Sequence, residues 1–229
     1  MPDKVVVLSG SGLSAESGLP TFRDAAGLWR QHSWKDLASP EGWRKQPQLV
    51  LEFYNERRAR AWSAVPNAAH RAIADLEKQF DVVVVTQNVD NLHERAGSTQ
   101  VLHLHGELCF ARGTGPSHER IRIDGAPIEL GQKCSEGTQL RPDIVWFGEE
   151  TQYMDEAREH VERADKVLVV GTSLSVYPAA SLVEYAAPHA EKVLNSIEME
   201  SVPAGFQYLP GQATAVVPRI TARWSASRA

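Results

Sequence analysis

Two short polar stretches in the chain have residue types and spacings that can do chemistry. Residues 86–90 read Thr-Gln-Asn-Val-Asp, and their amides and carboxylate can contact a carboxamide and a ribose, or simply join a strand to a helix. Further along, His103 and His105 stand two positions apart, so they lie on the same face of a strand. Such a pair can bind a metal, sit as satisfied core residues, or supply a base, because a histidine pKa of about 6.5 leaves the ring neutral near pH 7.

A third candidate site lies near the N-terminus. The apolar run Val5–Leu8 leads into Gly10-x-Gly12 and then into small residues that can open a helix. Glycines let the backbone approach a pyrophosphate, which helix N–H groups can bind, although a tight strand–helix turn has the same pattern. Residues 20–48 show no second strand ending in the acidic residue of a hydride-transfer enzyme. The sequence therefore predicts dinucleotide binding without ordinary redox chemistry.

Apolar runs and helical patterns alternate along the rest of the chain. This alternation favours a doubly wound parallel sheet, in which ligands bind outside the carboxyl ends of the strands. Because four predicted strands are followed by polar or glycine-rich residues, those residues are expected to converge on one crevice. The predicted strands are Val5–Leu8, Val82–Thr86, Val167–Gly171 and Lys192–Asn195, with Ala215–Val217 as a further candidate, and the predicted helices are Asn67–Gln79, Asp155–Ala164 and Ala179–Ala187.

Two segments do not fit the sheet and are predicted to form a smaller lobe. Residues 31–66 look helical, and residues 107–141 look β-rich, with a hairpin signal at Asp124-Gly125 between alternating arms in 120–130. The expected fold is α/β, a Rossmann-like doubly wound parallel sheet with a small lobe formed by two insertions. Its dinucleotide-binding domain comprises residues 1–30, 67–106 and 142–229, and its small lobe comprises residues 31–66 and 107–141.

Bulk properties exclude several classes of protein. A formal charge of −5 and a pI near 5.9 argue against a nucleic-acid or membrane-surface partner. No apolar run approaches the roughly 20 residues that span a bilayer, and the first strand begins too early to leave room for a signal peptide. Two cysteines predict no disulfide framework and fit a cytoplasmic protein. The sequence does not set the oligomeric state, and a monomer is compatible with it.

Longer motifs carry a resemblance to a known family. The string Gly10-x-Gly12-x-Ser-x-Glu-Ser-Gly-x-Pro-x-Phe-Arg23, the string Thr-Gln-Asn-x-Asp-x-Leu-His in 86–93, and His105 directly before glycine resemble the sirtuins, which are NAD-consuming protein deacylases. The resemblance runs from residue 5 to about 220. It implies that NAD is bound by Gly10, Ser11, Gly12, Ser14, Glu16, Pro20, Thr21, Phe22, Arg23, Trp29, Gln87, Asn88, Asp90, Gly171, Thr172, Ser173, Asn195 and Ala213.

The resemblance also implies a mechanism. An acyl-lysine carbonyl oxygen attacks the ribose carbon that carries nicotinamide, His105 acts as the general base on a ribose hydroxyl, and the acyl group passes to ADP-ribose. Asn88 is the second catalytic residue and lines the nicotinamide pocket with Asp90. Phe22 shields the reactive face, Arg23 orders the loop, and His103 is expected to be structural or to support the site.

Residues 107–139 depart from the family pattern. Most sirtuins hold a structural zinc with two Cys-x-x-Cys pairs, and such a site needs about four ligands. Here Cys109 and Cys134 stand alone, and a borrowed His118 still leaves the site one ligand short, so we predict no metal. The Asp124-Gly125 hairpin is expected to provide apolar contacts instead. A second departure lies at residues 195–198, which read Asn-Ser-Ile-Glu and are one residue longer than the family's Asn-x-Glu. The role of Glu198 therefore stays open.

The sequence also points to the acyl group. Tyr54 and Arg57 stand three apart, on one face of a predicted helix, where a buried tyrosine and a solvated arginine are common. One sirtuin subgroup carries Tyr-x-x-Arg here, and the pair reads the carboxylate of succinyl-, malonyl- or glutaryl-lysine, because a guanidinium binds a carboxylate through two hydrogen bonds. The resemblance thus implies acylated-lysine protein substrates, with desuccinylase and demalonylase activity at least comparable to deacetylase activity. The peptide is expected to pair with Val145, Phe147 and Gly148.

Two other functions remain open for this scaffold. An NAD glycohydrolase or ADP-ribosyltransferase would use the same nicotinamide pocket, but it gives Tyr54 and Arg57 no obvious role. A non-catalytic NAD sensor would not need the intact His105 and Asn88. Product analysis distinguishes these functions, because only the deacylase releases O-acyl-ADP-ribose.

Overall fold

A six-stranded parallel sheet forms the centre of the computed structural model, which describes residues 2–21 and 33–226. The strand order is β3-β2-β1-β7-β8-β9, so the chain first builds outward on one side of β1 and then on the other. Such a reversal marks the ligand-binding edge of a doubly wound sheet. The predicted Rossmann-like fold is therefore confirmed. The strands are β1 (Lys4–Ser9), β2 (Asp81–Thr86), β3 (Val101–His103), β7 (Lys166–Val170), β8 (Glu191–Ser196) and β9 (Gln207–Pro210).

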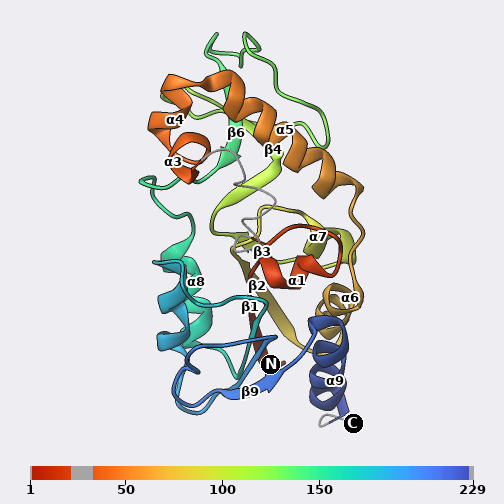
Figure 1. Ribbon diagram of the computed structural model, residues 1–229. Helices are drawn as coiled ribbons and strands as arrows, with labels where there is room; N and C mark the ends of the chain where they lie inside the picture. The colour runs from red at the N-terminus through yellow and green to blue at the C-terminus, as the bar shows by residue number, and fades with distance from the viewer. Residues whose placement is uncertain (1, 22–32, 227–229) are drawn as a thin grey trace.

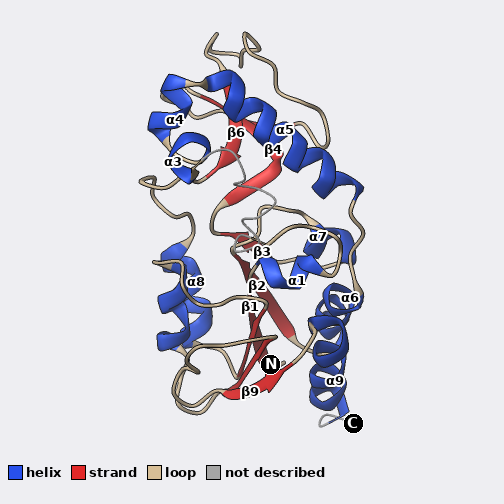
Figure 2. Ribbon diagram, in the orientation of Figure 1, coloured by secondary structure: helices blue, strands red, loops and turns tan. Residues whose placement is uncertain are grey.

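Helices cover both faces of this sheet (Figures 1 and 2). Side chains alternate along β1, so Val5 and Val7 face one layer while Val6 and Leu8 face the other. The first layer consists of α6 (Ala68–Asp75) and α9 (Ala213–Ala226), and the second of α8 (Met154–Glu162) and a 3-10 helix (Ala179–Tyr185). Both faces of the central strands are thus buried, which explains their unbroken apolar sequence.

The prediction of a strand at Ala215–Val217 is wrong, because these residues lie inside helix α9. The short apolar run looks like a strand, but Val217, Ile220 and Trp224 recur at helical spacing and pack against the sheet. The sixth strand is instead β9. Its residues are only half buried at the sheet edge, so it lacks the apolar run of a central strand.

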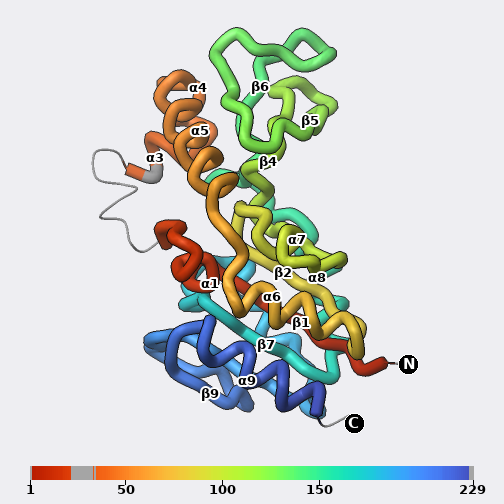
Figure 3. Tube along the Cα trace, turned by 90° about the vertical axis from the view of Figure 1, so that its right-hand side faces the viewer, coloured from red at the N-terminus to blue at the C-terminus, as the bar shows by residue number. Residues whose placement is uncertain are grey.

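A smaller lobe stands above the carboxyl edge of the sheet (Figure 3). Its strands form a separate antiparallel sheet in the order β5-β4-β6. Helix α5 packs on this sheet, where Leu51 joins Ala111, Ile128 and Leu140 in one apolar cluster. The elements of the lobe are α3 (Trp34–Leu37), α4 (Pro40–Lys45), α5 (Pro47–Ser63), β4 (Gly106–Gly113), β5 (Arg120–Arg122) and β6 (Leu140–Ile144).

The hairpin expected within 120–130 does not form. Asp124 does sit in a turn, with φ of 51° and a 2.9 Å bond from Ala126 N to Ile123 O. However, β5 pairs with β4, and residues 123–130 run as a loop instead of returning along β5. Ile128 is buried, and its backbone N–H and C=O are both bound by the side chain of Asn55 on α5, so helix contacts replace strand pairing.

Three short elements complete the described chain. Helix α1 (Ser11–Ala15) follows β1, a 3-10 helix (Leu76–Lys78) follows α6, and α7 (Leu92–Ala96) follows β2. The predicted helix Asn67–Gln79 is therefore α6 plus a 3-10 turn, and the predicted helix Ala179–Ala187 is a 3-10 helix. No helix in the described ranges is long and apolar enough to cross a membrane.

Candidate functional site

A cavity of about 700 Å³ lies between the carboxyl edge of the main sheet and the small lobe. Residues that follow β1, β2, β7 and β8 line it, as the sequence predicts. All the described site residues contribute to its wall, whereas Phe22, Arg23 and Trp29 lie outside the described residues. The predicted residues on the wall are Gly10, Ser11, Gly12, Ser14, Glu16, Pro20, Thr21, Tyr54, Arg57, Gln87, Asn88, Asp90, His105, Val145, Phe147, Gly148, Gly171, Thr172, Ser173, Asn195 and Ala213.

Glycines bring two strand ends into backbone contact at the floor of the cavity. Gly12 N donates to Gly171 O at 2.8 Å, and Gly10 N donates to Val170 O at 3.0 Å. A Cβ on Gly12 would stand 2.8 Å from Gly171 O, and one on Gly171 would overlap the nitrogen of Leu13. Only glycine fits these positions, and the bare backbone beside the start of α1 suits a pyrophosphate.

The far end of the cavity has an unpaired polar atom. Asn195 is 1% exposed, and its Nδ2 donates to Leu209 O at 2.8 Å and to Gly211 O at 3.1 Å. Its Oδ1 has no hydrogen-bond partner in the described part of the chain. A buried acceptor is costly without a partner, so this atom is placed for a ligand hydroxyl. Glu198 also reaches the cavity wall.

Asn88 is held firmly at the inner end of the cavity. Its backbone N donates to Thr86 Oγ1 at 3.0 Å, and its Nδ2 donates to Ser14 Oγ at 3.1 Å. Neighbouring Asp90 accepts a bond from Leu92 N at 3.1 Å, and burial raises the pKa of its carboxyl group. The two side chains form a polar, water-poor recess.

His105 lines the same recess from the connection between β3 and β4. Its Nδ1 lies 3.1 Å from Gln87 O. A carbonyl only accepts, so we assign the proton to Nδ1, which leaves the lone pair on Nε2. Burial lowers the pKa of His105, although the bond to Gln87 opposes the shift, and the ring is therefore neutral near pH 7. A neutral ring with a free Nε2 can act as a general base.

The residue after His105 must be glycine for a steric reason. Gly106 has φ of 79°, and a Cβ there would overlap the carbonyl oxygen of Asp143 on β6. This close approach lets β4 pair with β6 immediately after the histidine, with Gly106 opposite Ile144. The His-Gly dipeptide therefore anchors the catalytic candidate to the small lobe.

Tyr54 and Arg57 approach the cavity from helix α5. Tyr54 is 1% exposed, and Trp146 Nε1 donates to its phenolic oxygen at 3.1 Å. Arg57 packs on the rings of Phe53 and Tyr54, with Cζ 5.5 and 5.6 Å from the ring centroids. Burial lowers the pKa of Arg57, whereas nearby Tyr54 and Asp90 raise it. Within residues 2–21 and 33–226, no carboxylate forms an ion pair with this guanidinium.

Residues 145–148 connect the small lobe with the main sheet and form one rim of the cavity. Val145 N donates to His105 O at 2.9 Å, and Phe147 N donates to Ala38 O at 3.0 Å. Phe147 is 41% exposed, and Gly148 has φ of 92°. This segment, which ends in a turn at 147–148, is therefore tied through its backbone to His105.

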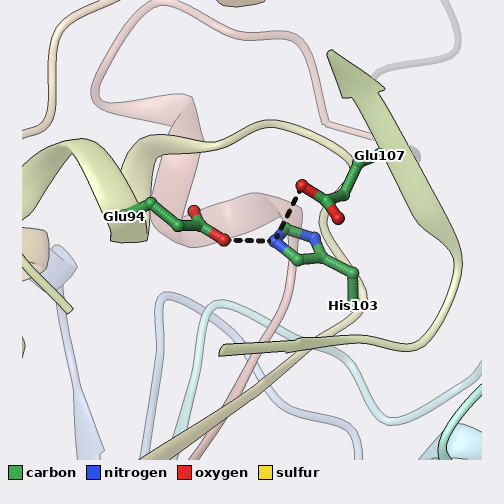
Figure 4. A group of neighbouring side chains, drawn as sticks. All are labelled: Glu94, His103 and Glu107. Atoms are coloured by element: carbon green, nitrogen blue, oxygen red, sulfur yellow. Dashed lines mark hydrogen bonds and ion pairs between the residues drawn. The ribbon is translucent and has the colours of Figure 1, made fainter. Parts of the chain in front are cut away.

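The two cysteines do not meet as metal ligands. Cys109 Sγ lies 3.4 Å from Glu107 Oε2, and Cys134 Sγ lies 3.1 Å from Thr138 Oγ1. Neither belongs to a group of three potential ligands in the described chain. The residues present therefore do not fit a four-ligand zinc site. The one such group among the described residues is Glu94, His103 and Glu107 (Figure 4).

Sequence reasoning missed part of the site. It left out Trp146, which orients Tyr54, although the pattern Val-Trp-Phe-Gly-Glu around it was noticeable. It expected His103 to be structural or to support the site, but it did not consider Glu94, the partner of His103 nine positions earlier on α7. No spacing rule connects these two residues, because only the fold brings α7 beside the end of β3.

Comparisons with known proteins agree with this geometry. A model of the Sir2 family matches residues 10–178. A protein of Helicobacter pylori called NAD-dependent protein deacylase is 52% identical over 182 residues, which cover 80% of this chain and 77% of that protein. One from Shewanella oneidensis with the same name is 42% identical over 229 residues, covering 96% and 93%.

Solved structures show the same relationship. A Sir2 homologue in complex with NAD superposes with a TM-score of 0.89 at 36% identity, covering 100% of this chain and 91% of that one. A Sir2 protein with a p53 peptide and NAD gives 0.79 at 27% identity, covering 98% and 95%. With more than half of the chain matched by the family model and nearly all of it by these relatives, the chain belongs to the Sir2 family, the sirtuins.

Proposed function

We propose that this sirtuin is an NAD-dependent protein-lysine deacylase that prefers acyl groups ending in a carboxylate. The deacylase activity is that of the relatives, and the acyl preference is supported by Arg57. Its guanidinium lines the cavity and has no carboxylate partner among the described residues. Arg57 is partly buried, and a partly buried cation without an ion-pair partner is costly, so the site favours a substrate that brings a negative charge.

Tyr54 complements the guanidinium. Its oxygen already accepts a bond from Trp146, so its own O–H remains able to donate to the ligand. Burial raises the pKa of Tyr54, which keeps the phenol protonated and able to donate at neutral pH. A carboxylate can thus take two bonds from Arg57 and one from Tyr54. An acetyl group offers none of these contacts.

NAD fits the residues at the other end of the cavity. The bare glycine backbone at Gly10, Gly12 and Gly171 would hold the pyrophosphate, and the unpaired Oδ1 of Asn195 would hold a ribose hydroxyl. Asn88 and Asp90 would hold the nicotinamide. When bound, NAD would supply the ribose carbon from which nicotinamide is displaced and the ribose hydroxyl that receives the acyl group.

The chain's own residues then have distinct tasks. Nε2 of His105 would take a proton from a ribose hydroxyl, while the bond from Nδ1 to Gln87 O keeps the ring oriented. Asn88, fixed by Thr86 and Ser14, would orient the carboxamide. The segment 145–148 would pair with the peptide backbone, adding a strand beside the cavity.

The experiment compares kcat/KM for succinyl-lysine and acetyl-lysine versions of one peptide with NAD. We expect the wild type to prefer the succinyl peptide, and Arg57→Met to lower that rate roughly 10- to 100-fold while the acetyl rate changes little. Tyr54→Phe should act in the same direction with a smaller effect. Arg44→Met is the matched control, because Arg44 lies on the neighbouring helix α4 of the same lobe but is exposed and outside the cavity wall.

Two results would contradict the proposal. Equal rates on both peptides, unchanged by Arg57→Met, would make the enzyme a general deacylase with a solvated arginine. Release of free ADP-ribose instead of O-acyl-ADP-ribose would show NAD hydrolysis or ADP-ribosyl transfer on the same scaffold.

A further inference from the structure

His103 is a buried histidine that does not reach the cavity. It ends strand β3, two residues before His105, and is 4% exposed. Its ring lies between Glu94 of α7 and Glu107 of β4 (Figure 4). Neither His103 nor Glu94 belongs to the cavity wall, so neither can touch a ligand directly.

Both ring nitrogens of His103 face oxygen atoms: a backbone carbonyl, which only accepts hydrogen bonds, and the carboxylate of Glu94, which only accepts while it is ionised. Nδ1 lies 2.9 Å from the backbone oxygen of Asn88, and Nε2 lies 2.7 Å from Glu94 Oε1. A neutral imidazole has one N–H, so it would direct a lone pair at one of these oxygens. Two donors are required, and only the protonated ring provides them.

We propose that Glu94 and protonated His103 form a partly buried ion pair that holds the Asn88 carbonyl and thereby positions the nicotinamide-binding segment 87–90. His103 is a positioning residue in this scheme, because it acts through Asn88. The inference rests on the proposed function for its kinetic consequence, since it assumes that Asn88 binds the nicotinamide. The ion pair itself rests on geometry alone.

The surrounding charges are consistent with a cation at this position. Burial by itself would lower the pKa of His103, but the hydrogen bond and charge of Glu94, the charge of Glu107 and the bond to Asn88 O together raise it. Glu107 is shared, because Arg120 of β5 also forms an ion pair with it and Cys109 lies 3.4 Å from it. Glu94 is therefore the main counter-ion. Its own pKa is lowered, since the effect of burial is outweighed by the bond to His103 and its charge.

Two further titratable groups face His103. Asp90 is close enough for the His103 charge to lower its pKa, against the larger effect of burial. His93, on α7 beside Glu94, is fully buried, and burial followed by repulsion from His70 and His103 keeps its pKa well below the usual value. His93 is thus neutral, and His103 is the cation of this cluster. Its charge partly offsets the effect of burial on the pKa of Asp90.

A proton fits this cluster better than a metal ion. The candidate ligand atoms of Glu94, His103 and Glu107 lie within 4.8 Å of one another. However, two ligands of a tetrahedral zinc at about 2.0–2.1 Å stand about 3.3 Å apart. The separation of 2.7 Å between His103 Nε2 and Glu94 Oε1 is that of a charge-assisted hydrogen bond.

The pair completes a set of contacts that fix the segment after β2. Thr86 holds the N–H of Asn88, Ser14 holds its side chain, and His103 holds its carbonyl. His105 holds the carbonyl of the preceding residue, Gln87, at 3.1 Å. The two histidines therefore form hydrogen bonds with the carbonyl groups of adjacent residues. Loss of one of these contacts is expected to displace Asn88 without unfolding the protein.

The first test is direct. Nitrogen-15 NMR of the imidazole groups, assigned with His103→Asn, should show both ring nitrogens of His103 protonated at pH 7 to 8, where His105 is neutral. In Glu94→Gln, which keeps the size of the side chain but removes its charge, the pKa of His103 should fall by at least about one unit. A ring that is neutral in the wild type, or that titrates unchanged in Glu94→Gln, would overturn the ion pair.

The second test is kinetic. His103→Phe should lower kcat roughly 10-fold or more and weaken product inhibition by nicotinamide, with the KM for the acyl peptide little changed. His103→Asn should recover part of the loss, because its amide can still donate to the Asn88 carbonyl. His160→Asn and Glu156→Gln, a His–Glu pair on α8, are matched controls that should behave as wild type. Wild-type kinetics in His103→Phe would overturn the positioning role.

These outcomes separate the inference from the proposed function. A doubly protonated His103 in a protein that deacylates neither peptide would support the ion pair and reject the proposed function. A result of one bound divalent ion per chain would instead indicate a metal site and overturn the ion pair. This ion would have to be absent in His103→Asn, and a chelator would have to remove it together with activity.

Discussion

The indole of Trp146 donates a 3.1 Å hydrogen bond from Nε1 to the phenolic oxygen of Tyr54. Both side chains are almost completely buried, and they come from the rim segment 145–148 and from helix α5. The rim segment 145–148 and helix α5, which we propose bind the peptide and the acyl group, are thus coupled through one bond. Arg141 stacks on the same indole, with Cζ 3.3 Å from the ring centroid, and is tied to Glu149.

This bond predicts a specificity change from a residue that is not expected to touch the acyl carboxylate. Trp146→Phe removes the donor that orients Tyr54, so desuccinylation should fall about 5-fold more than deacetylation, as expected for loss of a bond contributing about 1 kcal/mol. The ratio of kcat/KM values on matched peptides is the measurement. Trp224→Phe, a buried tryptophan on α9, should leave the ratio unchanged. An equal loss on both peptides would assign only a packing role to Trp146.

The pKa of His105 predicts the acid side of the pH profile. Burial lowers the pKa of His105 below 6.5, and the ring must be neutral to act as a base. Activity should therefore be retained at pH 6.5 and be lost only as the pH falls through the lowered pKa of His105. The measurement is kcat/KM against pH on the acyl peptide. An acid limb centred above pH 6.5 would contradict a buried base.

His105→Asn should abolish turnover while leaving NAD binding largely intact.

His70 predicts a pH-dependent stability. Burial lowers its pKa from 6.5 to about 4, and it has no solvent exposure. Between these values the unfolded chain binds a proton that the folded protein does not, so stability is lost as the pH falls from 6.5 towards 4, by up to about 3 kcal/mol.

His70→Gln should remove this part of the acid sensitivity, since glutamine can still accept the capping bond from Asn67 N but does not titrate there. Urea unfolding at several pH values measures it. Exposed His118→Gln is the control. Parallel pH profiles for wild type and His70→Gln would reject the assignment.

Substitution of Gly106 is predicted to destabilise the fold strongly. Gly106→Ala forces a Cβ onto the Asp143 carbonyl at φ of 79°, so it should destabilise the fold by about 3 kcal/mol or more and displace His105. Gly131→Ala separates the two effects, because Gly131 has φ of 92° but open space around its Cβ position. That variant should cost only about 1 kcal/mol and keep full activity. Thermal unfolding and kcat together provide the comparison.

The small lobe is predicted to fold without zinc. Cys134 contacts Thr138 and Cys109 contacts Glu107, and Ile128 packs into the apolar cluster of the lobe. Purified protein should therefore hold well under one equivalent of zinc by elemental analysis, and a chelator should not change its melting temperature. About one equivalent of tightly bound zinc, lost in Cys134→Ser, would contradict the prediction.

The sequence by itself determined the central sheet and the edge where ligands bind. Buried parallel strands need unbroken apolar runs, and glycines with positive φ or close contacts cannot be replaced, so Val5–Leu8 and the pair Gly10 and Gly12 were readable directly. Positions 54 and 57 were also readable, because three residues on a helix fix a shared face.

Only the tertiary structure decided the rest. The edge strand β9 is half exposed and has no distinct pattern, whereas Ala215–Val217 is apolar enough to imitate a strand inside α9. The side chain of Asn55 forms hydrogen bonds with the backbone N–H and C=O of Ile128, so the chain after the Asp124 turn does not pair as a hairpin. Glu94 and His103 meet because α7 packs beside the end of β3, and contacts between separate elements depend on packing that local sequence patterns do not encode.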